Sequence, residues 1–552
     1  MKHYKIDLTY WKNTDYEESQ TKLTNDLRLL HKDKYEQDEL IILDHTVDYY
    51  VGKSKLGLIL RNIQTIINEE DISNCFIMIR STNPKIAQEM QLLKQISTDP
   101  MPMLFEYIKG DFENKKLLNH PGSKKDLYAY GSVNPLMISL ENVSEKERKL
   151  LSESKTFCMY PWIHLHAYPT GEAYPCCMAD MENGKIGNCK ENTLKEIWNS
   201  PAQRQLRLDM LTETKNSACS MCYEKEKSGF FSGRQSANKH HGHLIERVLE
   251  TKEDGTYENF EMVYWDIRFS NLCNLSCRSC GHIFSSSWYK DQAALAGPEW
   301  AKNNNVLNYA GRHETDMMDQ LMEHLEYVEQ IYFAGGEPLM MDEHYVILEE
   351  LERRERFDVR LIYNTNFTHV KLKNRLVFDY WKKFKSVSVG ASLDAMGARA
   401  EYIRKGTKWK TVEENRQQMI EICPQVDFYI SPTLSIMNAL HIPDFHRDWV
   451  DKGYIKPQDL NVNVVQNPDF YRVDIATQEY KDKIIEKYQN HLEWLRPLDQ
   501  LNRATSGYES AIQYLKTDNT HLIEKFWKKT DQLDSIRNEN ILDVIPELGA
   551  LR

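Results

Sequence analysis

The clearest pattern along the chain is a rhythm of short apolar runs and helical patterns between residues 255 and 472. The runs are rich in β-branched and aromatic residues, and stretches such as DEHYVILEELERRER between them repeat apolar residues at helical spacing. The six runs are EMVYWDIRF, VEQIYFA, FDVRLIYN, KSVSVGA, VDFYISPTL and LNVNVV. Strands separated by helices connect through right-handed crossovers, so we predict a parallel α/β sheet, either doubly wound or an incomplete barrel.

The first 150 residues show a second, smaller alternation. Strand-like runs ELIILDHTVDY, NCFIMIRS and MPMLFEYI are separated by the helical patterns KLGLILRNIQTIINEE and PKIAQEMQLLKQIS. This order predicts a small α/β domain over residues 1–150. No catalytic signature stands in it, and its role is unknown.

Two further regions complete the predicted organisation. Residues 151–250 combine cysteines and glycine-containing turns with one helical stretch, TLKEIWNSPAQRQLRLDML, and read as a metal-centred module. The segment from 473 to 552 is rich in helix formers and is predicted to be a helical region. The repeating α/β core is placed at residues 255–472.

Composition and charge narrow the class of protein. The 552 residues are 41% hydrophobic and 28% charged, as in ordinary globular proteins. The N-terminus shows no apolar signal segment and no run approaches the roughly 18 apolar residues of a membrane span, so we expect a cytoplasmic protein without a membrane partner. A net charge of -12 argues against general nucleic-acid binding and against an RNA-modifying enzyme.

Nine of the 11 cysteines fall in two clusters, which favours metal ligation over disulfides in a reducing compartment. One cluster, FSNLCNLSCRSC, places Cys273, Cys277 and Cys280 directly after the first core strand. Three thiolates leave one position of a four-ligand iron–sulfur or zinc shell open. The alternative is a structural zinc site with a distant fourth ligand such as His282.

The C-x3-C-x2-C spacing of these cysteines resembles the signature of radical S-adenosylmethionine (SAM) enzymes. The resemblance covers about residues 260–470 and implies a partial (β/α)6 TIM-like barrel. It also implies that the three cysteines bind a 4Fe–4S cluster whose open iron binds the amino and carboxylate groups of SAM. SAM would be cleaved reductively to a 5′-deoxyadenosyl radical that abstracts a hydrogen atom from the substrate.

The same resemblance assigns SAM contacts at the ends of later strands. The second strand ends in GGEP, which the family uses to bind the SAM amino group, here Gly335, Gly336, Glu337 and Pro338. Asn366 of the NTN stretch, Ser392 after the fourth strand and Arg404 downstream are the further expected contacts. Asp394 is left as either a site residue or the cap of the following helix. All follow predicted parallel strands, the edge where α/β sheets carry their sites.

The second cluster resembles SPASM and twitch modules, which hold auxiliary iron–sulfur clusters in radical SAM enzymes. Its GN and IWNS elements support the resemblance, which implies Cys158, Cys176, Cys219 and Cys222 as ligands of one auxiliary 4Fe–4S cluster, with Cys177 as the alternative to Cys176. The number of cysteines in this segment fits the twitch form, which holds one auxiliary cluster, better than the SPASM form, which holds two. A four-cysteine zinc site is the alternative, and the module is unusual in preceding the core.

These features predict a radical SAM enzyme with two 4Fe–4S clusters and SAM as cofactors. The expected reaction is oxidative modification of a peptide or protein side chain, with the auxiliary cluster as electron acceptor. An external one-electron donor such as a flavodoxin or ferredoxin is the expected partner. The alternatives are a small-molecule substrate, which would require a closed pocket, and a non-catalytic iron–sulfur redox or sensor protein.

Overall fold

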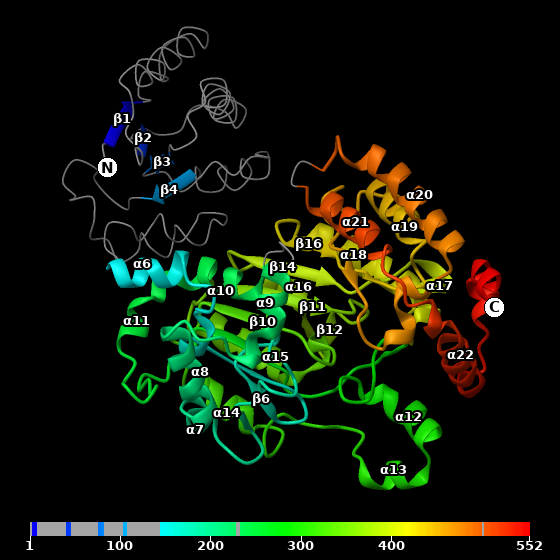
Figure 1. Cartoon of the computed structure of the whole chain (residues 1–552), viewed down its shortest axis with the longest axis horizontal. Coiled ribbons are helices and arrows are strands. Elements are labelled where there is room, and N and C mark those ends of the chain that lie inside the picture. The colour runs from blue at the N-terminus through cyan, green and yellow to red at the C-terminus, as the bar shows by residue number, and fades with distance from the viewer. Residues whose placement is uncertain are drawn as a thin grey trace. The chain divides into compact units, whose positions relative to one another are not determined.

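A computed structural model describes residues 3–7, 40–45, 76–81, 103–107, 144–227, 232–499 and 502–552 (Figure 1). The chain divides into two compact units, which are described separately. The first comprises Met1–Met159, Met210–Lys215 and Cys222–Glu250. The second comprises Tyr160–Asp209, Asn216–Met221 and Thr251–Arg552.

The first unit contains a parallel four-stranded sheet in the order β1-β2-β3-β4. Its strands are β1 (His3–Asp7), β2 (Leu40–His45), β3 (Phe76–Ser81) and β4 (Met103–Tyr107). The last three confirm strands predicted from the apolar runs, whereas β1 was not predicted. The helices predicted at 55–70 and 84–97 lie outside the described residues.

The first unit also includes helices α6 (Glu145–Ser152) and α10 (Gly233–His241). Both begin with capping boxes, in which a serine caps the first turn and a Glu or Gln side chain returns to the serine backbone. In α10, the buried Arg234 side chain forms an ion pair with Glu226 at 2.6 Å. The helix is therefore anchored at its first turn.

An eight-stranded sheet forms the second unit, in the order β16-β14-β11-β10-β8-β5-β6-β7 (Figure 1). Six neighbouring strands are parallel: β5 (His164–Ala167), β8 (Tyr264–Ile267), β10 (Gln330–Phe333), β11 (Arg360–Thr365), β14 (Val387–Ala391) and β16 (Asp427–Ile430). Strands β6 (Glu172–Tyr174) and β7 (Gly187–Asn188) continue the sheet antiparallel. The predicted α/β class with a parallel sheet is confirmed.

The sixth core strand predicted from LNVNVV takes a different place. Residues Asn463–Val464 form β18, which pairs with β17 (Thr433–Leu434) in a separate two-stranded sheet. Just before β18, Leu460 forms an isolated parallel bridge with Ile430 of β16 in the main sheet. Pro432, which separates β16 from β17, has no backbone N–H to continue the ladder, and this interrupts the strand. The position next to β8 is occupied by β5 instead.

One face of the parallel strands is buried under helices α15 (Asp342–Arg353), α16 (Val377–Trp381), α18 (Trp409–Ile422) and α19 (Ile442–Asp451). Tyr363 of β11 is fully buried there. Its ring packs 4.9 Å from that of Trp381, and its hydroxyl lies 3.0 Å from Nε2 of His344. Alternate residues of each strand therefore form the core, and the intervening residues face the opposite side.

The helical stretch predicted at TLKEIWNSPAQRQLRLDML is divided into α7 (Leu194–Trp198) and α8 (Pro201–Leu211). Pro201 is the first residue of α8, where its missing N–H costs no intrahelical bond, while the residue before a proline is disfavoured in helical geometry. The proline therefore starts a second helix in place of continuing the first.

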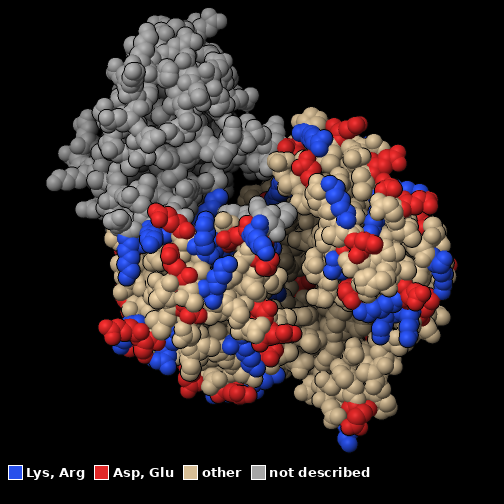
Figure 2. Space-filling view, in the orientation of Figure 1, with Lys and Arg blue, Asp and Glu red and all other residues tan. Residues whose placement is uncertain are grey.

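The C-terminal region is helical, as predicted. It contains α20 (Gln478–Leu495), α21 (Arg503–Tyr514), α22 (Ile523–Arg537) and α23 (Ile541–Val544). On the face shown in Figure 2, acidic and basic side chains are interspersed over the described surface. Among the described residues, none of the helices combines the length and apolar character needed to cross a bilayer.

Candidate active site

The three core cysteines lie on a loop that follows β8, residues 273–280, called the cysteine loop below. Within it, β9 (Ser276–Cys277) pairs antiparallel with β15 (Arg404–Lys405). The backbone N–H of Arg278 also donates to the Ile403 carbonyl at 2.8 Å. The middle of the loop is therefore held by backbone hydrogen bonds to a segment more than 120 residues away.

Side chains from the following helical turn hold the rest of the loop backbone. The Trp288 indole donates to the Cys277 carbonyl at 2.8 Å, and the Ser287 hydroxyl donates to the Cys273 carbonyl at 2.7 Å. These two carbonyl groups already accept hydrogen bonds from the protein. The thiol side chains are therefore the groups of the loop that are left to bind a metal. Cys273 and Cys280 are half-buried and Cys277 is buried.

Two polar side chains approach the cysteine sulfurs. Arg404 Nη1 donates to Cys277 Sγ at 3.6 Å, and Asn366 Nδ2 donates to Cys273 Sγ at 3.8 Å. Burial alone would lower the pKa of Arg404, but the neighbouring Asp394 and Cys277 raise it, so the guanidinium stays charged. Hydrogen bonds and positive charge at thiolate sulfurs are features that tune iron–sulfur clusters.

Burial raises the pKa of Cys280 to about 12 and also raises the pKa of Cys273 and Cys277. The bare thiols therefore carry their protons at neutral pH. A metal that binds them must displace these protons, as thiophilic metals do outright. Three thiols on one loop, with cationic and amide donors at two sulfurs, fit a 4Fe–4S cluster with one iron free of protein ligation.

The GGEP loop packs directly against the cysteine loop. Gly335 and Gly336 have positive φ angles of 79° and 48°, which non-glycine residues rarely adopt. A Cβ atom on Gly336 would clash with the carbonyl oxygen of Leu272, the residue before Cys273. The backbone N–H of Glu337 donates to that same carbonyl at 2.7 Å. The two glycines thus allow a close approach of two backbones at the predicted SAM site.

Glu337 itself is fully buried and its carboxylate is engaged by the protein. Oε1 accepts from the Thr365 hydroxyl at 2.6 Å and from the Leu339 N–H at 3.1 Å, and Oε2 accepts from the Asn366 N–H at 2.7 Å. Burial raises the pKa of Glu337 to about 7, although these hydrogen bonds oppose the rise. The carboxylate joins the ends of β10 and β11, so the predicted direct contact with SAM would have to use an oxygen that already accepts from the protein.

The structure brings the predicted core residues to neighbouring strand ends. The cysteine loop follows β8, the GGEP loop follows β10, Asn366 follows β11 and Ser392 follows β14. These strands are consecutive neighbours in the sheet, and the Ser392 N–H donates to the Thr365 carbonyl at 2.8 Å. The clustering expected at one edge is therefore present, while the individual roles in SAM binding stay predictions.

Asp394 does not cap the following helix, which was one of its two predicted roles. Helix α17 (Gly397–Ile403) begins after Met396, which makes no side-chain capping bond. Asp394 Oδ2 instead lies 2.8 Å from Arg404 Nε, and Oδ1 accepts from the Thr433 N–H at 2.8 Å. The carboxylate orients the guanidinium that reaches Cys277.

His282, the fourth ligand in the zinc alternative, has its own partner. Its Nε2 lies 2.7 Å from the Asn305 carbonyl oxygen, and the residue is buried. Within the described part of the chain, no three His, Cys, Asp or Glu side chains are grouped so that they could hold a single metal ion.

Two of the four predicted auxiliary ligands belong to the second unit. Cys176 begins a turn in which its carbonyl accepts from the Ala179 N–H at 3.1 Å. The next N–H, of Asp180, donates to the Ala218 carbonyl at 3.0 Å, immediately before Cys219. Cys176 and Cys219 thus lie on segments joined by a backbone hydrogen bond.

The other two predicted ligands, Cys158 and Cys222, belong to the first unit. Both neighbours of Cys158 are bonded to Asn238 of α10, whose Oδ1 accepts from the Met159 N–H at 3.0 Å and whose Nδ2 donates to the Phe157 carbonyl at 3.0 Å. Cys222 is buried in helix α9 (Ser220–Lys227). The assignment of these four cysteines to one cluster stays a prediction.

The alternative ligand Cys177 lies in a different environment. Burial, and after it the charge of Asp266, raises the pKa of Cys177 to about 12. Cys189 is fully buried, and burial raises the pKa of its thiol to about 12. Cys423 is a core residue.

A buried polar network on the face of the sheet opposite the helices was not predicted from the sequence. Arg268 Nε donates to Asp266 Oδ1 at 2.7 Å, and His166 Nδ1 lies 3.1 Å from Asp266 Oδ2. Burial opposes ionisation, yet Arg268 and His166 hold the pKa of Asp266 well below its usual range. Further along this face, Asn364 Nδ2 donates to the Tyr332 hydroxyl at 2.6 Å. The available signal was the alternation of polar and apolar residues in YWDIRF.

Comparison with known proteins gives a family match for the cysteine-rich segment. Residues 158–223, which include all four predicted auxiliary ligands, match the SPASM family, described as an iron–sulfur cluster-binding domain. The resemblance of this segment to SPASM modules is confirmed, while the one-cluster twitch form stays a prediction. No curated protein matches the chain.

Among solved structures, the chain is similar to native anSMEcpe with bound AdoMet and Cp18Cys peptide, at 18% identity and a TM-score of 0.29, over 41% of this chain and 57% of that one. It is also similar to Streptococcus suis SuiB bound to S-adenosylmethionine, at 12% identity and a TM-score of 0.27, over 53% of this chain and 62% of that one. The chain therefore spans less than two thirds of each of these structures.

Proposed function

We propose that the protein is a radical SAM enzyme that uses two 4Fe–4S clusters and SAM to oxidise a side chain of a peptide or protein. When bound, the core cluster and SAM supply a 5′-deoxyadenosyl radical that abstracts a hydrogen atom from the substrate. An external donor such as a flavodoxin or ferredoxin delivers the electron for SAM cleavage.

The observation that carries the proposal is the arrangement around the cysteine loop. Three thiols on one loop leave a coordination position for a small molecule, and the glycine backbone of GGEP lies against the loop at Leu272. Asn366 and Ser392 follow the two adjacent strands. An electron carrier has no need of a ligand site at its cluster, so this arrangement favours an enzyme over a redox or sensor protein.

Each of the predicted core-site residues has a proposed task. Cys273, Cys277 and Cys280 hold the cluster, and Arg404 and Asn366 donate to its sulfur ligands. The half-buried Gly335 and Gly336 offer backbone polar groups to the SAM amino end, while the buried Glu337 keeps the ends of β10 and β11 in register for this contact. Ser392 and Arg404 remain the proposed contacts for the ribose and carboxylate.

The proposed substrate class rests on the exposure of one residue on the face of the sheet opposite the helices. Asn364 is an exposed residue although it stands near the end of the central strand β11. A small metabolite is expected to be enclosed in a pocket, whereas a polypeptide substrate needs an open face. We therefore favour a peptide or protein substrate over a small molecule.

The auxiliary cluster is proposed as the acceptor of the electron that remains after hydrogen abstraction. A complete shell of Cys158, Cys176, Cys219 and Cys222 would leave no iron open to substrate, so electron transfer is the role that fits it. The match of residues 158–223 to an iron–sulfur cluster-binding domain supports this assignment.

The proposal is tested by 5′-deoxyadenosine formation from SAM with the anaerobically reconstituted, reduced protein. The matched control is the triple variant in which Cys273, Cys277 and Cys280 are replaced by Ala. Product from the wild type alone would support the proposal. If the loaded wild-type protein forms no product and SAM does not change the electron paramagnetic resonance (EPR) signal of its reduced cluster, the redox or sensor function replaces it.

A further inference from the structure

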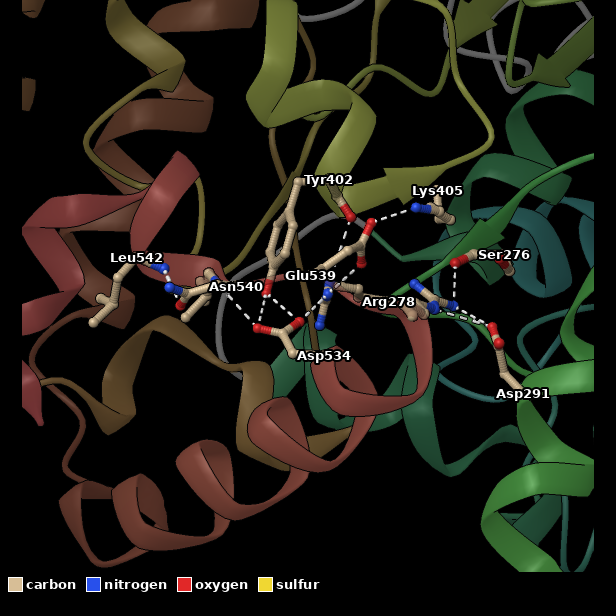
Figure 3. Close-up of polar contacts among 11 residues, drawn as sticks. Ser276, Arg278, Asp291, Tyr402, Lys405, Asp534, Glu539, Asn540 and Leu542 are labelled. Atoms are coloured by element: carbon tan, nitrogen blue, oxygen red, sulfur yellow. Dashed lines mark hydrogen bonds and ion pairs between the residues drawn. The ribbon is translucent and has the colours of Figure 1, made fainter.

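The C-terminal helix α22 reaches back to the cysteine loop. Arg278, between two of the cysteines, is fully buried, and its Nη2 donates to Asp534 Oδ1 and, at 2.8 Å, to Glu539 Oε2 (Figure 3). Asp534 lies in α22 and Glu539 lies just beyond its end. Arg278 therefore forms a buried ion-pair cluster at the loop with two carboxylates that lie 256 and 261 positions further along the chain.

The sequence at the end of α22 explains how both carboxylates reach one guanidinium. Asn538 has a left-handed backbone with φ of 52°, which ends the helix and reverses the chain. The Glu539 N–H then donates to the Asp534 carbonyl at 2.9 Å. The turn thus places Glu539 beside Asp534, and Lys405 of β15 bonds the second oxygen of Glu539 at 2.6 Å (Figure 3).

Asp534 is held rigidly by the protein around it. The Tyr402 hydroxyl donates to its carboxylate at 2.8 Å, and the Ile541 N–H donates to Oδ2 at 2.8 Å. The Arg278 guanidinium stacks 3.7 Å from the centre of the Tyr402 ring. Arg278, Asp534, Glu539 and Tyr402 therefore each have more than one partner, which restricts the position of Arg278 and of the loop that carries it.

A second contact from the same helix acts on the loop backbone. Arg537 Nη2 donates to the Ser276 carbonyl at 2.7 Å and pairs with Asp291 at 2.7 Å. Its side chain is almost fully buried. Because β15 holds the loop on its other side, the cysteine loop is bonded both to a core strand and to the C-terminal helix.

We propose that Asp534 and Glu539 are positioning residues for the core cluster, acting through Arg278 of the cysteine loop. The carboxylates keep the loop in the geometry that presents its three thiols and compensate a buried positive charge next to the cluster. The cluster assignment rests on the proposed function, whereas the restraint on the loop does not.

The first test measures the restraint in the metal-free protein by hydrogen–deuterium exchange of the peptide that contains residues 273–280. Asp534→Asn and Glu539→Gln should each accelerate exchange of this peptide at least tenfold. The matched control is Glu547→Gln, which breaks the 2.7 Å ion pair between the C-terminal segment and Arg399 of α17 without touching the loop. Wild-type exchange in both variants, or equal acceleration in the control, would overturn the proposal.

The second test measures the reduction potential of the reconstituted core cluster by an EPR-monitored titration. Loss of either carboxylate leaves more positive charge at Arg278, so the potential should shift upward, and Asp534→Asn should cause little further shift in an Arg278→Gln background. Equal shifts in both backgrounds, or none in either, would refute the coupling. If Asp534→Asn does not fold, Glu539→Gln, at a more exposed position, supplies both tests.

These results are separable from failure of the proposed function. If the wild-type protein loads no cluster at the three cysteines, the radical SAM assignment fails, yet the exchange measurement on the metal-free protein still decides whether the C-terminal carboxylates restrain the loop. If the wild type loads the cluster and responds to SAM while both variants behave as wild type, the proposed function stands and the positioning role is refuted.

Discussion

Arg404 connects a cysteine of the core loop to a buried carboxylate. Its Nη1 donates to Cys277 Sγ at 3.6 Å, while its Nε lies 2.8 Å from Asp394 Oδ2. Arg404 also pairs with Cys277 in the β9–β15 ladder, and this pairing fixes the position of the Arg404 backbone from which the side chain extends. One residue thus contributes both a backbone and a side-chain contact to the proposed cluster ligand.

Replacement of Arg404 by Gln should destabilise the metal-free protein. Asp394 would remain buried without its cationic partner, and breaking a buried pair in this way costs about 3 to 5 kcal/mol. Urea unfolding under reducing conditions measures the loss. The control is Arg399→Gln, whose partner Glu547 is partly exposed and whose loss should cost no more than about 1 kcal/mol. Equal losses in the two variants would contradict the prediction.

The Gly336→Ala variant should weaken SAM binding at least tenfold and lower stability by about 1 to 3 kcal/mol. The added Cβ meets the Leu272 carbonyl, so the two loops must separate. Gly397→Ala is a close control, because Gly397 also has a positive φ, of 59°, but open space around its Cβ position. It tests backbone strain alone. Binding isotherms and thermal unfolding distinguish the two effects, and equal SAM affinity in both variants would argue against close packing at Gly336.

Glu337 should produce a pH dependence of stability in the metal-free protein. Burial raises the pKa of Glu337 to about 7, so the folded state binds this proton more tightly than the unfolded state. Its contribution is therefore fully present below the unfolded pKa of about 4.3 and is lost as the pH rises through about 7. Glu337→Gln lacks this loss, and its stability relative to wild type should rise by about 3 kcal/mol between pH 4.5 and pH 8.

The measurement for Glu337 is chemical unfolding of both proteins at several pH values in the presence of a chelator. Because only the difference between the two proteins is used, titration of other groups common to both cancels. A constant difference across the range would show that the three hydrogen-bond donors, and not burial, control the charge of this carboxyl group.

The auxiliary ligand set can be tested by comparing adjacent cysteines. Cys176→Ala should remove the auxiliary cluster and about half of the iron bound by two clusters, whereas Cys177→Ala should retain the full amount. The reason is that the Cys177 thiol is buried near Asp266 of that polar network, and both effects keep it protonated. Iron analysis with EPR of the reduced proteins checks both variants. Loss of iron in Cys177→Ala alone would exchange the two assignments.

Much of the fold was predictable because it depends on local pattern. Apolar runs identified the strands β2, β3, β4, β8, β10, β11, β14 and β16, since strand residues near each other in sequence share an environment. The sixth core strand was predicted at the right residues and in the wrong sheet. Pairing partners depend on contacts between distant segments, and a proline break together with the competing strand β5 decided them.

The sequence by itself determined the chemical content of the candidate site: three cysteines at fixed spacing on one loop, a glycine pair at a strand end and a second cysteine cluster. Such groups are set by covalent spacing and can be read without knowing the fold. Only the tertiary structure decided that Asp394 holds Arg404 and that Asp534 and Glu539 hold Arg278. A buried charge can take a partner from anywhere in the chain, and the partner is determined by which segments packing brings together, not by distance along the sequence.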